Sequence, residues 1–280
     1  MGREKKLTIG DVLIYAAFVL IALFILLPIY KVLVDSLDLK SGYGMRLWPE
    51  AFSFLGYKII LTTKSLYQPF LISVITTLVG TLMGLAIVTL GAYVLIQWDM
   101  PGRTFFSYFL LFTMIFEGGM IPTYLVMRQL KLINTLWAVI LPMSMSVYNL
   151  VLMRNFFEGI PGSLLEAAQI DGCSPIGIFF KVVLPLSKAA LASIGLMFGV
   201  AFWNNYTNFK LYISNRDLYN FQMKLRDMMQ GSDMVQTAES IATNTLNNAA
   251  VIVAILPFMI IYPFCQNYFV QGVNVGAVKE

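Results

Sequence analysis

The sequence predicts an all-α, polytopic membrane protein of about six transmembrane helices, on three observations. Hydrophobic residues make up 58% of the chain and charged residues only 12%, whereas soluble domains carry about 25% charge. Apolar runs of about 20 residues, the length that crosses a bilayer as a helix, recur along the chain. One polar stretch, residues 154–187, lies between two of these runs. The length of 280 residues suits a single membrane domain over residues 1–280.

The expected spans follow the apolar runs in chain order. They cover roughly Val12–Val34, Leu71–Ile96, Phe105–Val126, Leu136–Leu152, Ala189–Tyr212 and Leu246–Val270. In the second span, the spacing Gly80-x-x-x-Gly84 favours close helix packing in lipid. Residues 35–70 and 214–243 are expected to be connecting loops.

The third expected span carries a carboxylate, Glu117, which is followed by Gly118-Gly119 and Pro122. Two glycines and a proline favour a broken helix at this point. A carboxylate at that depth is costly in lipid, so we expect Glu117 to face the bundle interior or a water-filled cavity. The sequence therefore predicts that Glu117 lies on a substrate path.

The polar stretch 154–187 has the local signals of a helical hairpin. Glu166-Ala167-Ala168 favours a helix, and Asp171-Gly172 favours a turn that ends it. Ser174 can cap a second helix, with Pro175 at its first position. These signals alone leave two interpretations: a plain hairpin between two spans, or a docking element that transmits force from a soluble partner.

The pattern E-A-A, two residues, D-G, with Pro185 downstream, resembles the EAA loop of ABC importer permeases. Cys173 departs mildly from that pattern, because a small residue, often alanine, is usual there. Other stretches are similar to the carbohydrate-uptake branch, the maltose-transporter-like permeases, so the resemblance covers nearly the whole chain. They are Met120–Leu125, Leu132–Thr135, Leu141-Pro142, Met153–Phe157 and Trp203–Asn205.

The resemblance implies the permease subunit of a binding-protein-dependent ABC importer, with an oligosaccharide or related glycan as cargo. In this family the EAA loop lies in the cytoplasm, and its first helix binds a groove on the ATPase subunit. The implied ATPase-coupling residues are Glu166, Ala167, Ala168, Asp171, Gly172 and Pro185. The implied partners are a second homologous permease, two ATPase subunits that bind ATP and Mg²⁺, and an extracytoplasmic substrate-binding protein, with no nucleic acid. Such a permease lies in the prokaryotic cytoplasmic membrane, within the lipid bilayer, with its N-terminus in the cytoplasm.

The end of the fifth expected span, Trp203-Asn204-Asn205-Tyr206, combines aromatic rings with amides. Sugars need both, because their C–H faces stack on rings while their hydroxyl groups bond to amides. We assign these four residues to the substrate path, together with Glu117 and with Asn247 at the start of the sixth span. The alternative is an interfacial aromatic belt with polar contacts between helices.

Residue types that the chain lacks argue against an enzyme. There is no histidine, and Cys173 and Cys265 match no metal or redox spacing. No G-x-x-x-x-G-K-[ST] phosphate-binding loop is present, so ATP hydrolysis falls to another subunit. We expect no catalytic site, metal or cofactor in this chain. The main alternative is a stand-alone secondary carrier driven by an ion gradient, with Glu117 as its coupling acid. A membrane-bound enzyme is the weaker alternative.

Overall fold

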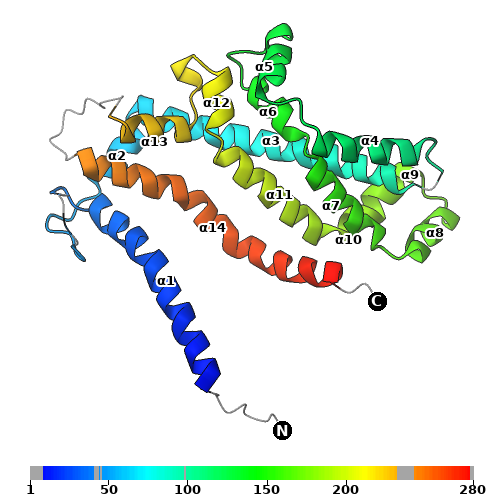
Figure 1. The fold of residues 1–280 in the computed structure, drawn as a ribbon, viewed down its shortest axis with the longest axis horizontal. Coiled ribbons are helices and arrows are strands. Elements are labelled where there is room, and N and C mark those ends of the chain that lie inside the picture. The colour runs from blue at the N-terminus through cyan, green and yellow to red at the C-terminus, as the bar shows by residue number, and fades with distance from the viewer. Residues whose placement is uncertain (1–8, 41–43, 45, 98, 232–242, 278–280) are drawn as a thin grey trace. The chain divides into compact units, whose positions relative to one another are not determined.

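The computed structural model of the chain describes residues 9–40, 44, 46–97, 99–231 and 243–277, the last eleven residues of the final range by their backbone alone. Within these residues the regular elements are helices, apart from an isolated antiparallel bridge between Asp38 and Phe52, and this confirms the predicted fold class (Figure 1). The chain divides into two compact units. The first is Met1–Tyr67 with Leu225–Leu256, and the second is Gln68–Lys224 with Pro257–Glu280.

Three long helices are separated along the chain by shorter ones. The long ones are α1 Ile9–Ser36, α3 Lys64–Ile96 and α14 Thr243–Ala277. The shorter ones are α2 Leu55–Thr62, α4 Arg103–Ile115, α5 Met120–Gln129, α6 Trp137–Ser144, α7 Val147–Glu158, α8 Gly162–Ile170, α9 Pro175–Ile178, α10 Leu184–Leu186, α11 Lys188–Trp203, α12 Thr207–Tyr212 and α13 Phe221–Met229. A π-helix, η1 Phe179–Val183, and a 3₁₀ turn, η2 Arg216–Leu218, complete the described elements.

Among the described residues, α1, α3 and the Thr243–Gln266 part of α14 are each long and apolar enough to cross a membrane. Up to six spans result if each bent helix pair counts as one span. The pairs are α4 with α5, α6 with α7, and Pro175–Leu186 with α11, bent by 111°, 44° and 81°. On that count, three predicted spans match continuous helices and the third and fourth match bent pairs, while the fifth matches only the α11 half of its pair.

The break predicted in the third span is confirmed, since α4 ends at Ile115 and α5 begins at Met120. Gly119 has a φ of +85°, in the left-handed region that glycine reaches without strain. Glu117 lies in this break, and its side chain is exposed in the single chain.

Several predicted boundaries were wrong. Residues 35–70 are not one loop, because they contain α2 and the first turn of α3. The described part of 214–243 contains η2 and α13, and the fifth span ends at Trp203 instead of Tyr212. Arg154 lies inside α7, so the polar stretch 154–187 begins in the last turns of a helix. Hydropathy marks the part of a helix that lipid can cover, so it misses the polar turns of α3 and α7 and the short helices α2 and α13. It also runs on past the end of α11, because apolar residues continue in α12 after the break at Asn204-Asn205.

In the second unit, α3 and α11 pack closely through glycines. A Cβ placed on Gly84 would lie 2.9 Å from the ring of Phe198, and one on Gly80 would overlap the ring of Phe202. Both rings are buried. The predicted close packing at these glycines is confirmed, because the absent side chains let the rings lie against the α3 backbone.

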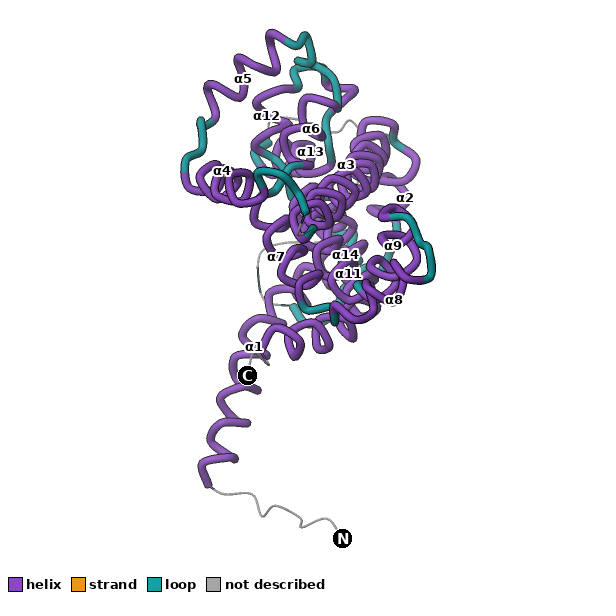
Figure 2. The backbone as a smooth tube through the Cα atoms, turned by 90° about the vertical axis from the view of Figure 1, so that its right-hand side faces the viewer, coloured by secondary structure: helices purple, strands orange, loops and turns teal. Residues whose placement is uncertain are grey.

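The two ends of α3 hold different parts of the second unit. Near its start, the Gln68 side chain donates to the Asp217 carbonyl oxygen at 2.7 Å, and near its end the Tyr93 hydroxyl donates to the Pro175 carbonyl oxygen at 2.7 Å. Figure 2 shows α5, α6 and α12 gathered apart from α8 and α9. An apolar cluster joins α5, α6, α12 and the start of α13, and its buried members are Met127, Ala138, Val139, Phe209, Tyr212, Ile213 and Met223.

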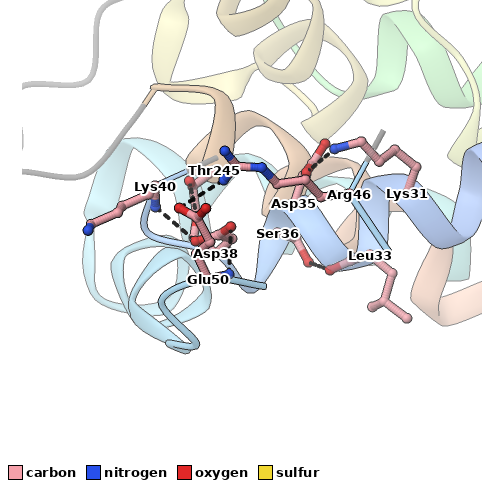
Figure 3. A network of polar contacts seen from close by, with 9 residues as sticks. All are labelled: Lys31, Leu33, Asp35, Ser36, Asp38, Lys40, Arg46, Glu50 and Thr245. Carbon is pink, nitrogen blue, oxygen red and sulfur yellow. Dashed lines mark hydrogen bonds and ion pairs between the residues drawn. The ribbon is translucent and has the colours of Figure 1, made fainter. Parts of the chain in front are cut away.

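In the first unit, the buried carboxylate of Asp38 organises the segment that follows α1 (Figure 3). It accepts hydrogen bonds from the backbone N–H groups of Lys40 (3.0 Å), Glu50 (3.1 Å) and Ala51 (3.1 Å). Its backbone carbonyl accepts a hydrogen bond from the Thr245 hydroxyl in α14. Burial alone would raise the pKa of Asp38, but those three N–H groups and the nearby Arg46 outweigh burial, so the pKa lies below its ordinary value.

Candidate functional site

The polar stretch forms the predicted hairpin. α8 ends at Ile170, and α9 begins at Pro175 with Ser174 as its N-cap. The Ser174 hydroxyl oxygen accepts a hydrogen bond from the Gly177 N–H at 3.1 Å, which satisfies one of the backbone donors that a helix start leaves open. The short helix, the break at Gly172 and the second short helix are therefore confirmed.

Gly172 closes α8 in the left-handed conformation, with a φ of +77°. Its N–H donates to the Gln169 carbonyl, and the Cys173 N–H donates to the Ala168 carbonyl, both at 3.0 Å. These two bonds make a Schellman motif, in which glycine is preferred because a Cβ is strained at positive φ. A Cβ placed on Gly172 meets no heavy atom within 4 Å. The preference for glycine here comes from backbone conformation and not from crowding.

The outer surface of the hairpin is apolar with a few charges. Ile170 is 86% exposed and Ile176 is 71% exposed, while Ala168 is buried. The other exposed motif residues are Glu166, Ala167, Asp171, Gly172 and Pro185. No ion pair within the described part of the chain includes Glu166 or Asp171. Exposed isoleucines beside carboxylates on a short helix suit a protein partner that has an apolar groove and a cationic residue.

The inner side of the hairpin is anchored to the helical core. The ring of Tyr93, whose hydroxyl bonds to Pro175, also packs on Phe179 with ring centroids 4.9 Å apart. Ile178, Phe179 and Val183 are buried in the cluster that α3, α7 and α11 share. The π-helix η1 lies at this anchor, and π-helical turns are rare and often found at functional sites. The hairpin is therefore built into the core and is not a free loop.

Trp203, at the end of α11, is a core residue in this structure. Its side chain is 4% exposed and packs edge-on against Phe70 and Phe258, with ring centroids 5.6 and 6.0 Å apart. Both neighbours belong to the same unit as Trp203. The ring therefore positions the residues that follow it and offers no open face for a sugar to stack on.

The next three residues differ in exposure. Asn204 is exposed, and its side-chain oxygen lies 3.5 Å from the Gln222 amide nitrogen that donates to it. Asn205 is buried, and its side-chain oxygen accepts a hydrogen bond from the Asn208 N–H at 3.0 Å. Tyr206 is half-buried against the cluster of α5, α6 and α12. Asn204 is thus the member of this group that a substrate could reach in the described structure.

The remaining substrate-path candidates lie apart from this group. Glu117 is exposed in the break between α4 and α5, in the second unit. Asn247 is half-buried near the start of α14 and belongs to the first unit. That these residues share one path stays a prediction.

Two structural asparagines were not predicted. The Asn220 amide donates to the Asn205 carbonyl at 2.5 Å, and its oxygen accepts from the Met223 N–H at 3.0 Å. Asn134, with a φ of +63°, accepts a hydrogen bond from the Ser214 N–H at 2.6 Å. The local signal was present, since asparagine is favoured at helix starts and tolerates the left-handed region, but the partner residues are distant in sequence.

A family model described as "Binding-protein-dependent transport system inner membrane component" matches residues 93–275, a range that contains the hairpin, the α4–α5 break and α11. The chain belongs to this family. The permease is therefore a multi-pass inner-membrane transport subunit and not itself an enzyme, and the interpretation as a stand-alone secondary carrier was wrong.

Similar proteins place the permease in the carbohydrate-uptake branch, as the resemblance implied. It is 38% identical to the polygalacturonan/rhamnogalacturonan transport system permease protein YtcP of Bacillus subtilis, over 96% of this chain and 98% of that protein. It is 29% identical to the arabinooligosaccharides transport system permease protein AraQ of Halalkalibacterium halodurans, over 99% of each. A solved bacterial ABC transporter involved in the import of the acidic polysaccharide alginate has a similar chain, with a TM-score of 0.87 and 28% identity over 95% of this chain and 99% of that one.

Proposed function

We propose that this permease is one of two related membrane subunits in an importer for an oligosaccharide released from a larger polysaccharide. The relatives are named for polygalacturonan and rhamnogalacturonan and for arabinooligosaccharides, and the similar solved transporter imports alginate. An extracytoplasmic binding protein delivers the cargo, and two ATPase subunits bind ATP and Mg²⁺. This chain supplies the membrane path and the contact with one ATPase.

Uptake by the assembled importer tests the cargo class. Proteoliposomes that contain both permeases and the ATPases, supplied with the binding protein, should import labelled oligogalacturonides or arabino-oligosaccharides when ATP is inside. A peptide probe of similar mass should not enter. ATP-dependent uptake of the peptide, with neither sugar probe transported, would contradict the proposal.

The exposed hairpin is the observation that carries the coupling role. A short helix with Ile170 exposed at its end, closed by Gly172 at positive φ, stands outside the apolar spans while its inner side is anchored to α3. We assign the contact with the ATPase to α8, with Glu166 and Asp171 facing cations on that partner and Ala167 allowing close approach. Ala168 and Pro185 hold the hairpin on its core side and at its exit toward α11.

The cytoplasmic position that we propose for the hairpin also assigns a side to the N-terminus, with each bent pair counted as one span. α1, α3, the α4–α5 pair and the α6–α7 pair precede the hairpin, and an even number of crossings returns the chain to the same side. The N-terminus therefore lies in the cytoplasm with the hairpin. We treat the chain as one transmembrane domain, in which the coupling loop begins after α7.

The substrate path takes its accessible groups from the second unit. Glu117 and Asn204 are exposed there and can accept or donate hydrogen bonds to sugar hydroxyl groups. Trp203, Asn205 and Tyr206 support the position of Asn204, and we keep Asn247 of the first unit as a further candidate for contact with the cargo. In this scheme, movement of the hairpin on ATP binding tilts the spans so that these groups are open first to one side of the membrane and then to the other.

Replacement of Gly172 tests the coupling role. Gly172→Val should leave membrane insertion normal, because the apolar spans are unchanged, yet lower uptake by at least about tenfold while ATP hydrolysis continues, because a β-branched residue strains the left-handed cap. Glu166→Lys should act in the same direction by reversing a charge at the contact. The measurements are ATP hydrolysis and uptake in reconstituted importer.

Gly10→Val is the matched control. Gly10 lies in α1, outside the hairpin, and a Cβ there also meets no heavy atom within 4 Å, but its φ is not positive. This variant should transport at close to the wild-type rate. If Gly172→Val and Glu166→Lys both assemble and import like the wild type, the hairpin is not the coupling element.

A further inference from the structure

A polar cluster joins three helices at the base of the coupling hairpin. The Glu158 carboxylate accepts a hydrogen bond from the Arg154 Nε at 2.8 Å and lies 3.7 Å from an Arg103 guanidinium nitrogen. Arg154 also donates to the Ser107 hydroxyl at 3.1 Å, and the Arg103 Nε donates to the Leu95 carbonyl at 2.7 Å. The cluster therefore connects the end of α3, the first turns of α4 and the last turns of α7.

The cluster lies next to the hairpin in the chain. Glu158 is the last residue of α7, and the hairpin helix α8 begins at Gly162. Arg103 is the first residue of α4. Along the chain, α8 is joined to α7 by the short connection between Glu158 and Gly162, and through space the hairpin also packs on α7 in the shared apolar cluster.

Apolar packing between α4 and α7 is incomplete at this place. α4 packs against α7, yet none of its residues is buried in the single chain. A cavity of about 150 Å³ lies beside the cluster, and its lining residues are Leu95, Ser107, Leu110, Leu111, Leu150, Val151, Arg154, Asn155 and Glu158. Two polar contacts join α4 to α7 beside this cavity, from Arg154 to the Ser107 hydroxyl and from Arg103 to the Glu158 carboxylate.

The three charged side chains fix the position of α4 relative to α7 more than they stabilise the fold. An isolated exposed ion pair contributes little, but here one carboxylate is shared by two guanidinium groups whose side chains are only 22% and 25% exposed. Each arginine is also held by a second bond, to the Leu95 carbonyl in one case and to the Ser107 hydroxyl in the other. The planar guanidinium fork gives these contacts a defined geometry.

We propose that Arg103, Arg154 and Glu158 form a joint that transmits the displacement of the coupling hairpin from α7 to α4. The proposal rests on the coupling role of the hairpin stated above. α4 ends at Ile115, directly before the break that contains Glu117. Movement of α4 therefore shifts the break, which carries an exposed carboxylate of the substrate path. In this scheme the three residues are positioning residues, which need not touch the cargo or ATP.

Glu158→Gln tests the joint in the complete importer, because glutamine keeps the size of the side chain and one acceptor oxygen but removes the charge and replaces the other oxygen with an amide donor. The number of ATP molecules hydrolysed per labelled oligogalacturonide imported should rise at least about fivefold, the low end of typical coupling between sites. Assembly of the complex and ATP hydrolysis should be retained. This ratio separates a positioning role from a purely structural one, which would lower ATP hydrolysis and uptake together.

Two further variants complete the test. Glu50→Gln breaks the exposed Arg46–Glu50 pair, which has the same i,i+4 spacing outside the hairpin, and should leave the ratio unchanged. Ser107→Ala removes only the hydroxyl that holds Arg154, so it should raise the ratio less than Glu158→Gln, and the two effects should not add in the double variant.

An unchanged ratio in Glu158→Gln overturns the proposal, and so does loss of assembly in both Glu158→Gln and Ser107→Ala. The failure can be told apart from failure of the coupling role itself. If Gly172→Val uncouples the importer and Glu158→Gln does not, the joint alone is refuted. If neither uncouples it, the coupling role of the hairpin is refuted as well.

Discussion

At the scale of single residues, Gly172 and Asp38 both act through backbone groups. Gly172 ends α8 because its φ of +77° lets two N–H groups return to the last turn of the helix. In the irregular segment after α1, the Asp38 carboxylate accepts hydrogen bonds from three backbone N–H groups that no helix satisfies. Each residue gives a polar segment one defined shape, and in both cases the replacement of a single side chain should disturb that shape.

Asp38→Asn should loosen the segment after α1. Asparagine keeps one acceptor oxygen but places an amide donor opposite a backbone N–H, and an unsatisfied buried polar group costs about 1–3 kcal/mol. Hydrogen exchange at pH 7 should show the Glu50 and Ala51 amides protected in the wild type and at least about tenfold less protected in the variant. Asp35→Asn, which breaks the Lys31–Asp35 pair in α1, is the control and should leave these amides protected.

The same contact predicts a pH dependence. The pKa of folded Asp38 lies below that of the unfolded chain, which is about 3.9, so the ionised carboxylate stabilises the fold above that value. This stabilisation is lost as the pH falls through the folded-state pKa. After correction for intrinsic exchange, protection of the Ala51 amide should decline below about pH 3.9 in the wild type and stay low at all pH values in Asp38→Asn. Equal protection of the wild type at pH 7 and well below pH 3 would contradict this assignment.

At the scale of elements, α3 is the helix on which the second unit is assembled. Its glycines admit the rings of Phe198 and Phe202 from α11, and its last turns hold the coupling hairpin through Tyr93. The hairpin and α11 are therefore both positioned by their contacts with α3. A force applied at α8 acts against this helix, so the fit between α3 and α11 should matter to the stability of the permease.

Gly84→Ala tests that fit. Its Cβ would lie 2.9 Å from the Phe198 ring, closer than real contacts allow, so the variant should lower the free energy of unfolding by roughly 1–3 kcal/mol. Gly10→Ala, where a Cβ meets nothing within 4 Å, should have no such effect. Thermal unfolding of the detergent-solubilised complex measures both. Phe198→Leu combined with Gly84→Ala should recover part of the loss, and a Gly84→Ala protein as stable as the wild type would show that α3 and α11 are not packed this tightly.

At the scale of the whole molecule, the permease leaves much apolar surface without contacts of its own. The most apolar window of α1 has 0% of its residues buried, and α4 buries none of its described side chains. Lipid can cover such surfaces, but the exposed Glu117 next to α4 is costly in lipid. A protein partner on this side removes that cost, which agrees with assembly beside a second permease.

We therefore expect the chain to be unstable when it is produced without its partner subunits. Expressed without the second permease, it should aggregate or be degraded on extraction into mild detergent, and co-expression should restore a single peak in size-exclusion chromatography. The physical reason is that Glu117 is exposed, forms no ion pair among the described residues, and lies beside α4, which buries none of its side chains. A monodisperse single chain that imports the sugar probe without its partner subunits would show that the surface around Glu117 needs no protein partner.

Some features of this permease follow from the sequence alone, because their causes are local. The apolar runs predict the spans, since about 20 apolar residues are what a bilayer requires. Glu117-Gly118-Gly119 predicted the broken third span, and the order of Ala168, Gly172 and Ser174 predicted the hairpin with its cap. Each of these depends on residues within one or two turns of one another, where propensity and capping decide the outcome.

Other features were decided by tertiary structure, because their partners lie far apart in the chain. Hydropathy and spacing could not show that Trp203 packs between Phe70 and Phe258 and so is closed to a sugar. They also could not show that the Thr245 hydroxyl donates a hydrogen bond to the Asp38 carbonyl, or that Glu158 in α7 forms an ion pair with Arg103 in α4. A polar or aromatic side chain has the same local signal whether it faces a substrate path or its own core. The burial and the contacts of that side chain depend on which distant helix packs beside it, and the fold alone determines this.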